Sequence, residues 1–97
     1  MATQFGDRLR QLREQQNLLL RQVAPQLEMD TPLLSKIERG ERIAKKEQVG
    51  KLAEILKADK EELLTLWLAD QVYNVIKDED HADEALKSVS KKIKKTK

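Results

Sequence analysis

The 97-residue chain contains no cysteine, only three glycines and two prolines, and one residue each of Phe, Trp and Tyr. The lack of cysteine excludes disulfides, thiol nucleophiles and cysteine-ligated zinc or iron–sulfur centres. So few glycines and prolines are atypical of a turn-rich β-sandwich. No apolar run approaches the roughly 20 residues that a membrane-spanning helix needs, and no signal-peptide core begins the chain. We therefore expect a cytoplasmic protein with no membrane segment.

The motifs of catalytic and cofactor sites are also missing. A Gly-rich phosphate loop, a G-x-S-x-G elbow and an H-E-x-x-H helix are all absent, and His81 is the single histidine. The acidic run over residues 78–84 does not fit a calcium-binding EF-hand loop. The sixth and twelfth places of such a loop would hold Asp83 and Val89, where Gly and Glu are required. We expect no enzyme activity, metal, cofactor or small-molecule substrate.

The chain is instead rich in charged and helix-forming residues. Charged residues make up 37% of it, and its length suits one compact domain with or without an appendage. The net charge of +2 is unevenly distributed: residues 1–58 carry +3, residues 59–90 carry −6 and residues 91–97 carry +5. This segregation predicts a basic working surface, an acidic second element and a basic tail.

Apolar residues recur at spacings of three and four, which predicts amphipathic helices and an all-α fold. The first helix is expected over residues 4–16, with Thr3 as its N-cap. Asp30 is a strong N-cap for a third helix, and Gly40 ends that helix. Further helices are expected over residues 47–57, from Asp59 with Glu62 as its capping-box partner, and from about His81.

A short interval separates the second and third of these helices. The second helix contains Val23 and Leu27, and only two residues lie between Leu27 and Asp30. Two helices so close in sequence must cross sharply, which is the helix-turn-helix unit. Helical spacing places Leu34 and Ile37 on the buried side of the second helix in this unit. The residues that point outward or towards the rim are then Thr31, Pro32, Lys36 and Arg39.

Three stretches carry a resemblance to a known family: Arg10-Gln-Leu-Arg13, Val23-Ala24 and the run Leu34-Ser-Lys-Ile-Glu-Arg-Gly40. Residues 6–56, about half of the chain, resemble the Xre family, the phage-repressor and Cro type of helix-turn-helix. The resemblance implies an all-α, five-helix repressor-like DNA-binding bundle, followed here by a C-terminal helical extension. It also implies that the third helix lies in the major groove of duplex DNA.

Site residues follow from the same resemblance. The base-reading positions of the family fall on Thr31, Pro32 and Lys36. A structural ion pair is implied between Arg13 and Glu38. The positions that contact the DNA backbone fall on Arg21, Arg39, Arg42, Lys45 and Lys46.

The chain departs from the family pattern in its second helix and the following turn. Leu19 and Leu20 occupy the places of the usual Ser or Thr cap and of a phosphate-binding Gln. The phosphate contact is therefore lost or transferred to Arg21. Pro25 lies inside the second helix and predicts a kink, because proline removes a backbone hydrogen bond. Glu28 stands where the turn commonly has Gly, which predicts a tighter or strained turn.

The C-terminal part has more apolar residues than one bundle needs. Leu63 and Trp67 suffice to complete the core. The remaining apolar residues of that helix predict a dimer interface formed by Leu66, Val72, Val75 and Ile76. We therefore divide the chain into a helix-turn-helix DNA-binding domain over residues 1–68 and a C-terminal helical extension over residues 69–97, which we expect to be a dimerisation element with a basic tail.

These observations favour a sequence-specific, double-stranded-DNA-binding transcriptional regulator that reads the major groove with residues 31–39. A homodimer on a pseudo-palindromic operator is the expected form. An alternative is an antitoxin or adaptor that binds a partner protein through residues 60–97, with DNA binding secondary. A non-specific architectural DNA binder is disfavoured by the modest charge of +3 on residues 1–58.

Overall fold

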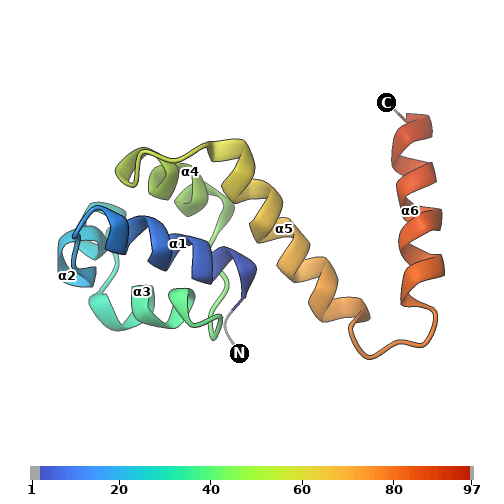
Figure 1. The fold of residues 1–97 in the computed structure, drawn as a ribbon, viewed down its shortest axis with the longest axis horizontal. Coiled ribbons are helices and arrows are strands. Elements are labelled where there is room, and N and C mark those ends of the chain that lie inside the picture. The colour runs from blue at the N-terminus through green and yellow to red at the C-terminus, as the bar shows by residue number, and fades with distance from the viewer. Residues whose placement is uncertain (1–2, 97) are drawn as a thin grey trace.

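Every regular element in residues 3–96, the part of the chain that the computed structural model describes, is helical (Figure 1). The all-α prediction is therefore confirmed. The elements are α1 (Gln4–Gln15), α2 (Leu20–Val23), the 3-10 turn η1 (Ala24–Leu27), α3 (Thr31–Glu38), α4 (Lys46–Ile55), α5 (Lys60–Ile76) and α6 (Ala82–Thr96). None of these helices has the length and apolarity needed to cross a membrane.

Local side chains begin and end the helices much as the sequence predicts. Thr3 caps α1, because its Oγ1 accepts a hydrogen bond from the Gly6 amide at 3.0 Å. Asp30 caps α3 in the same way, accepting from the Leu33 amide at 2.8 Å. Gly40 follows α3 with a φ of 77°, a left-handed conformation that glycine adopts at little cost. These caps satisfy backbone groups that a helix end leaves without a partner.

The prediction of a capping box at the start of α5 is wrong for Glu62 and right for the Asp59 cap. Asp59 accepts a hydrogen bond from the Glu61 amide at 3.1 Å, as a cap should. Glu62 does not return to the Asp59 amide; its carboxylate instead accepts from Nε of Arg8 on α1 at 3.1 Å. A tertiary ion pair has replaced the local contact, and it links α5 to α1.

One apolar core joins α1 to α5. Phe5 and Leu9 enter it from α1, and Leu63 of α5 is fully buried in it. Trp67 packs on its edge, so both residues predicted to complete the core do so. The other buried residues of the core are Leu12, Val23, Ala24, Leu27, Leu34, Ile37, Ala44, Val49, Leu52, Ala53 and Leu56.

Helix α5 leaves the bundle without a break, and α6 stands beyond it (Figure 1). The Trp67 indole donates to the Ala44 carbonyl at 2.8 Å. One turn later, the Asp70 carboxylate accepts from the Gln4 and Phe5 amides at 3.2 and 2.8 Å. Contacts with the bundle thus extend past residue 68, where the sequence suggests a domain boundary, and α5 runs on to Ile76.

Candidate nucleic-acid interface

Helix α3 presents two opposite faces. Leu34 and Ile37 are only 1% and 2% exposed and pack into the core. Pro32 and Lys36 are exposed, and Thr31 is partly exposed at the start of the helix. The orientation predicted for this helix is therefore confirmed. Its exposed face carries the residues that the sequence nominates for reading base edges.

The turn before α3 is short and strained. Glu28 lies in the left-handed region with a φ of 55°, a conformation that costs a non-glycine residue about 1–2 kcal/mol. The Met29 amide donates to the Ala24 carbonyl at 3.2 Å and closes the turn. The disruption expected at Pro25 appears as a change from α-helix to the 3-10 turn η1. Val23, Ala24 and Leu27 are buried, so this turn is held on the core.

The start of α2 lacks the usual side-chain cap. Leu19 occupies the N-cap position and makes no capping hydrogen bond. The Gln22 side-chain oxygen instead accepts from the Leu19 amide at 2.7 Å. Leu20 lines a cleft of about 250 Å³ together with Ser35 and Arg39 of the α3 region. The beginning of α2 and one side of α3 therefore border the same hollow.

Helix α1 holds the C-terminal end of α3 by an ion pair. Arg13 Nε donates to Glu38 Oε2 at 2.7 Å, and Arg13 Nη2 donates to Glu38 Oε1 at 3.0 Å. This is the pair that the resemblance implies. Arg13 Nη1 also donates to the Leu18 carbonyl at 2.9 Å, which extends the contact to the loop before α2. One guanidinium thus ties together three segments of the helix-turn-helix region.

Close backbone packing supports the same junction. A side chain at Gly6 would collide with the Glu38 carbonyl and lie 2.9 Å from the Ile37 carbonyl oxygen. Glycine is thus the residue that lets α1 approach the end of α3 so closely. Gly6 and the ion pair together position α3 relative to the rest of the bundle.

The charge of Glu38 is neutralised inside the protein. Its side chain is 7% exposed, and that of Arg13 is 12% exposed. The side-chain hydrogen bond with Glu38 raises the pKa of Arg13 above its ordinary value, although desolvation by burial acts in the opposite direction. The guanidinium of Arg13 is therefore charged at neutral pH. A carboxylate at the end of α3 would otherwise repel DNA phosphates.

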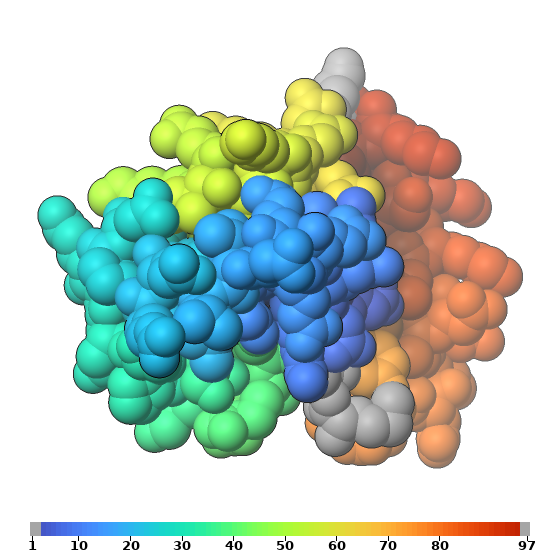
Figure 2. Space-filling model, turned by 60° about the vertical axis from the view of Figure 1, so that its left-hand side comes forward, coloured from blue at the N-terminus to red at the C-terminus, as the bar shows by residue number. Residues whose placement is uncertain are grey.

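Exposed cations precede α3, lie on it and follow it in the chain. Lys36 and Arg39 lie on the helix and its C-cap, and Arg21 lies on α2. The loop and the start of α4 add Arg42, Lys45 and Lys46, all of them exposed. In Figure 2 the α2–α3 region and the C-terminal segment lie on different sides of the molecule. Arg42, by contrast, borders a small pocket together with Asp70 of α5.

Arg39 has an acidic neighbour that the sequence reading missed. Its Nε donates to Glu41 at 2.8 Å, and both side chains are more than half exposed. An ion pair this exposed contributes about 0–1 kcal/mol, so a phosphate can replace Glu41 at little cost. The pairing depends on the turn after Gly40, which brings two residues so near in sequence face to face.

A family model described as a helix-turn-helix domain matches residues 4–66, which cover α1 to α4 and the first part of α5. The chain belongs to this helix-turn-helix family. No curated protein and no solved structure matches it. Helix-turn-helix domains bind DNA and serve transcription regulators, so this is a DNA-binding protein of that general kind, in a family that is typically non-enzymatic.

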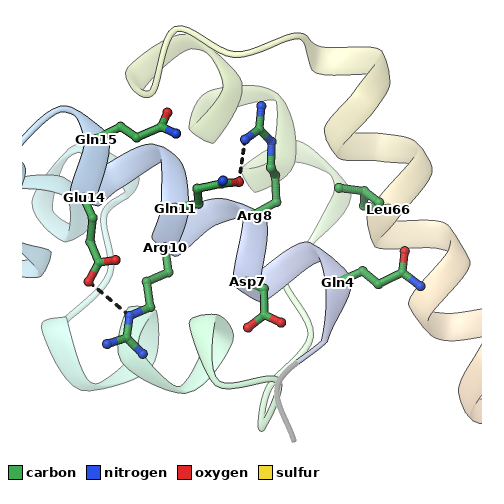
Figure 3. Close-up of a pocket in the computed structure, with 8 residues that line it drawn as sticks. All are labelled: Gln4, Asp7, Arg8, Arg10, Gln11, Glu14, Gln15 and Leu66. Atoms are coloured by element: carbon green, nitrogen blue, oxygen red, sulfur yellow. Dashed lines mark hydrogen bonds and ion pairs between the residues drawn. The ribbon is translucent and has the colours of Figure 1, made fainter.

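A broad hollow beside α1 is lined mainly by polar side chains. It is a shallow depression of about 860 Å³ over the outer face of α1 (Figure 3). The polar side chains around it already contact one another: Arg10 pairs with Glu14 at 3.2 Å, and Arg8 donates to Gln11 at 2.6 Å. Across residues 3–96, no group of three or more His, Asp or Glu side chains is arranged to hold a metal ion.

The four residues nominated for a dimer interface fall in two places. Val72 and Ile76 line a groove of about 470 Å³ between α5 and α6, together with Leu86. Val75 is 76% exposed on the same helix. Leu66 is partly buried and borders the depression over α1 instead. The helix-turn-helix protein therefore brings Val72 and Ile76 together at this groove, and Leu66 lies apart from them.

Proposed function

We propose that the protein is a sequence-specific transcriptional regulator of the Xre type that places α3 in the major groove of duplex DNA. The exposed face of α3 carries this proposal. It presents Thr31, Pro32 and Lys36 opposite a buried face, so these side chains are free to meet base edges. Lys36 suits guanine O6 and N7, which are acceptors. Pro32 offers only apolar contact, for example with a thymine methyl group.

Cations around that face supply phosphate contacts. Arg21 precedes α3, and the others follow it as Arg39, Arg42, Lys45 and Lys46. Leu20 cannot make the polar phosphate contact usual at its position, and its cleft neighbour Arg39 is well placed to replace it. Each phosphate neutralised makes binding weaker as salt rises, without selecting a sequence. Affinity then comes chiefly from this cluster and specificity from α3.

We further propose that the protein works as a homodimer, with residues 1–68 as the DNA-binding domain and residues 69–97 as the assembly element. A two-fold dimer presents two copies of α3 about 34–36 Å apart, one turn of duplex DNA. Its operator is then a pseudo-palindrome. Residues 59–90 carry a net charge of −6, which favours a position facing away from the DNA and towards a partner subunit.

Competition binding on genomic fragments at two salt concentrations tests the proposed function. We expect a few fragments to outcompete bulk DNA at both concentrations, with overall affinity falling as salt rises. If no fragment outcompetes bulk DNA at either concentration, the protein is not a sequence-specific regulator. A steep salt response without any preferred fragment would indicate an architectural binder.

A second function is supported by the apolar side chains exposed on the extension. Leu68 on α5 and Val89 on α6 are 56% and 54% exposed, which also suits an antitoxin or adaptor that binds another protein through residues 60–97. The two functions differ in the state of the isolated chain. An adaptor is expected to be monomeric alone and to form a stoichiometric complex with a protein encoded beside it.

A further inference from the structure

The segment between α3 and α4 carries much of the charge that the proposed function assigns to the DNA backbone. Arg39, Arg42 and Lys45 lie on residues 39–45, which form no helix, and Lys46 begins α4. Residues outside helices keep more conformational freedom, and freedom that is lost on binding weakens the affinity. How firmly this segment is held before DNA arrives therefore affects how well its cations meet phosphates.

Both ends of the segment are fixed by the neighbouring helices. After α3, the Glu41 amide donates to the Lys36 carbonyl at 2.8 Å. Before α4, the Lys45 amide donates to the Gln48 side-chain oxygen at 2.8 Å. The middle of the segment, residues 42–44, lies between these two bonds.

The middle is held from α5, through the single tryptophan of the chain. Within residues 39–46, Ala44 alone is buried, with 3% of its surface exposed. Its carbonyl accepts a hydrogen bond from Trp67 Nε1 at 2.8 Å. A buried carbonyl is costly to leave without a donor, so this bond fixes the orientation of the Ala44 peptide group. The preceding Ile43 is 65% exposed, so the segment turns one residue inward and the others outward.

Trp67 is itself held in place on α5. Its side chain packs on the edge of the core. One turn later, Asp70 accepts from the Gln4 and Phe5 amides of α1. Residues three apart share a helix face, so the two contacts fix the same side of α5. The indole N–H is thus presented to Ala44 from a fixed position.

We propose that Trp67 is a positioning residue for binding of the DNA backbone. It acts through the Ala44 peptide group, which it holds so that the flanking Arg42 and Lys45 face the DNA backbone together with α3. The inference rests on the DNA binding in the proposed function and adds a residue of α5 to it. Trp67 lies one position beyond residues 4–66, which the helix-turn-helix model matches, so this contact is a feature of this chain.

A small pocket connects Arg42 to the same anchor. Arg42 borders it together with Trp67 and Asp70, and the side chain of Arg42 is exposed. The two Asp70 oxygens already accept from α1, and an exposed guanidinium beside a carboxylate is transferred to a phosphate at little cost. Loss of the indole contact therefore affects Arg42 both through the backbone and through this pocket.

Removal of the indole N–H tests the proposal. Trp67→Phe keeps an aromatic ring and loses the donor. Replacement of Trp67 by benzothienylalanine, which is site-specific because the chain has one tryptophan, loses the donor and keeps the bicyclic shape. The isostere fills the same space, so it carries the test even if Trp67→Phe loosens the core.

Fluorescence anisotropy with a labelled duplex of scrambled sequence gives Kd over a series of salt concentrations. For both replacements we expect Kd at low salt to rise about three- to tenfold. The slope of log K against log salt should flatten by about one, the loss of roughly one phosphate contact. Tyr73→Phe is the matched control, because it removes a donor from an aromatic ring that is 61% exposed on the same helix. It should leave Kd and slope unchanged.

A double-mutant cycle separates positioning from a general effect on the fold. In the background Arg42→Ala/Lys45→Ala, the segment lacks the cations that Trp67 positions, so Trp67→Phe should change Kd by less than about twofold. In the background Arg21→Ala, which removes a cation of α2, the full effect should remain. A merely structural role would give the same loss in every background.

Circular dichroism at the temperature of the assay establishes that each variant is folded. Binding by the benzothienylalanine protein equal to that of the parent, or an equal loss from Trp67→Phe in both backgrounds, would overturn the proposal. A chain that selects specific fragments while both Trp67 replacements bind like the parent retains the proposed function and loses this inference. A chain that selects no fragment, but whose Trp67 replacements weaken binding through Arg42 and Lys45, does the opposite.

Discussion

Removal of the Glu38 carboxylate is the most informative perturbation of the DNA-binding bundle. Glu38→Ala leaves the Arg13 guanidinium, whose side chain is 12% exposed, with its hydrogen bond of 2.9 Å to the Leu18 carbonyl. Two charge-assisted hydrogen bonds, of 2.7 and 3.0 Å, are lost at once. The end of α3 also loses its ion pair with α1 and keeps its packing against Gly6.

The expected cost follows from that burial. Breaking a buried ion pair by removing one partner costs about 3–5 kcal/mol. Arg13 keeps a carbonyl partner and some contact with water, so we expect a loss in the free energy of unfolding of about 2–4 kcal/mol. Each kcal/mol lowers Tm by about 4–8 °C in a domain of this size. The variant should therefore melt at least about 8 °C below the parent.

Thermal and urea denaturation, followed by circular dichroism at 222 nm, measure this effect. The double variant Arg13→Met/Glu38→Leu removes both charges and keeps apolar volume, so it should be more stable than Glu38→Ala. The exposed pair of Arg10 with Glu14 is the matched control, and Glu14→Ala should cost at most about 1 kcal/mol. A Glu38→Ala variant no less stable than Glu14→Ala would refute the structural role of the buried pair.

Three smaller predictions concern packing and caps, all measured as free energies of unfolding in urea. Gly6→Ala should destabilise the protein by about 1–3 kcal/mol, because the new methyl group meets backbone atoms of α3. Gly50→Ala should instead stabilise it by up to about 1 kcal/mol, since a methyl group there meets only the end of the Lys60 side chain at an ordinary 3.5 Å and alanine favours a helix; the reverse order would contradict the close approach of α1 and α3. Asp70→Ala should cost about 0.5–2 kcal/mol through its two lost bonds to α1, whereas Asp78→Ala on the exposed loop should stay within about 0.5 kcal/mol.

Features determined within a few residues were predictable from the sequence. Thr3, Asp30 and Gly40 act at the helix ends where their side chains or backbone freedom predict them to act. The faces of α3 follow from helical spacing, since Leu34 and Ile37 must share one side. The ion pair of Arg13 with Glu38 required the family resemblance, because nothing in local spacing joins residues 25 positions apart.

Contacts between distant segments could not be predicted from local sequence patterns. Asp70 caps α1 from a position 65 residues away from Phe5, and a carboxylate on α5 carries no sign of that role. Glu62 had two possible partners, the nearby amide of Asp59 and the distant Arg8, and only the packing of α5 on α1 decides between them. Such choices depend on where whole helices lie, which is a property of the assembled core.

The central claim is that α3 reads base sequence, and selection from a random duplex library, followed by sequencing, tests it most directly. We expect the protein to enrich two half-sites about 10–10.5 base pairs apart. Lys36→Ala should relax the preference at one position in each half-site by about 1–3 kcal/mol, while Lys77→Ala, at the far end of α5, leaves the motif unchanged. A library without any enriched motif, or a motif that Lys36→Ala leaves intact at every position, would contradict recognition through α3.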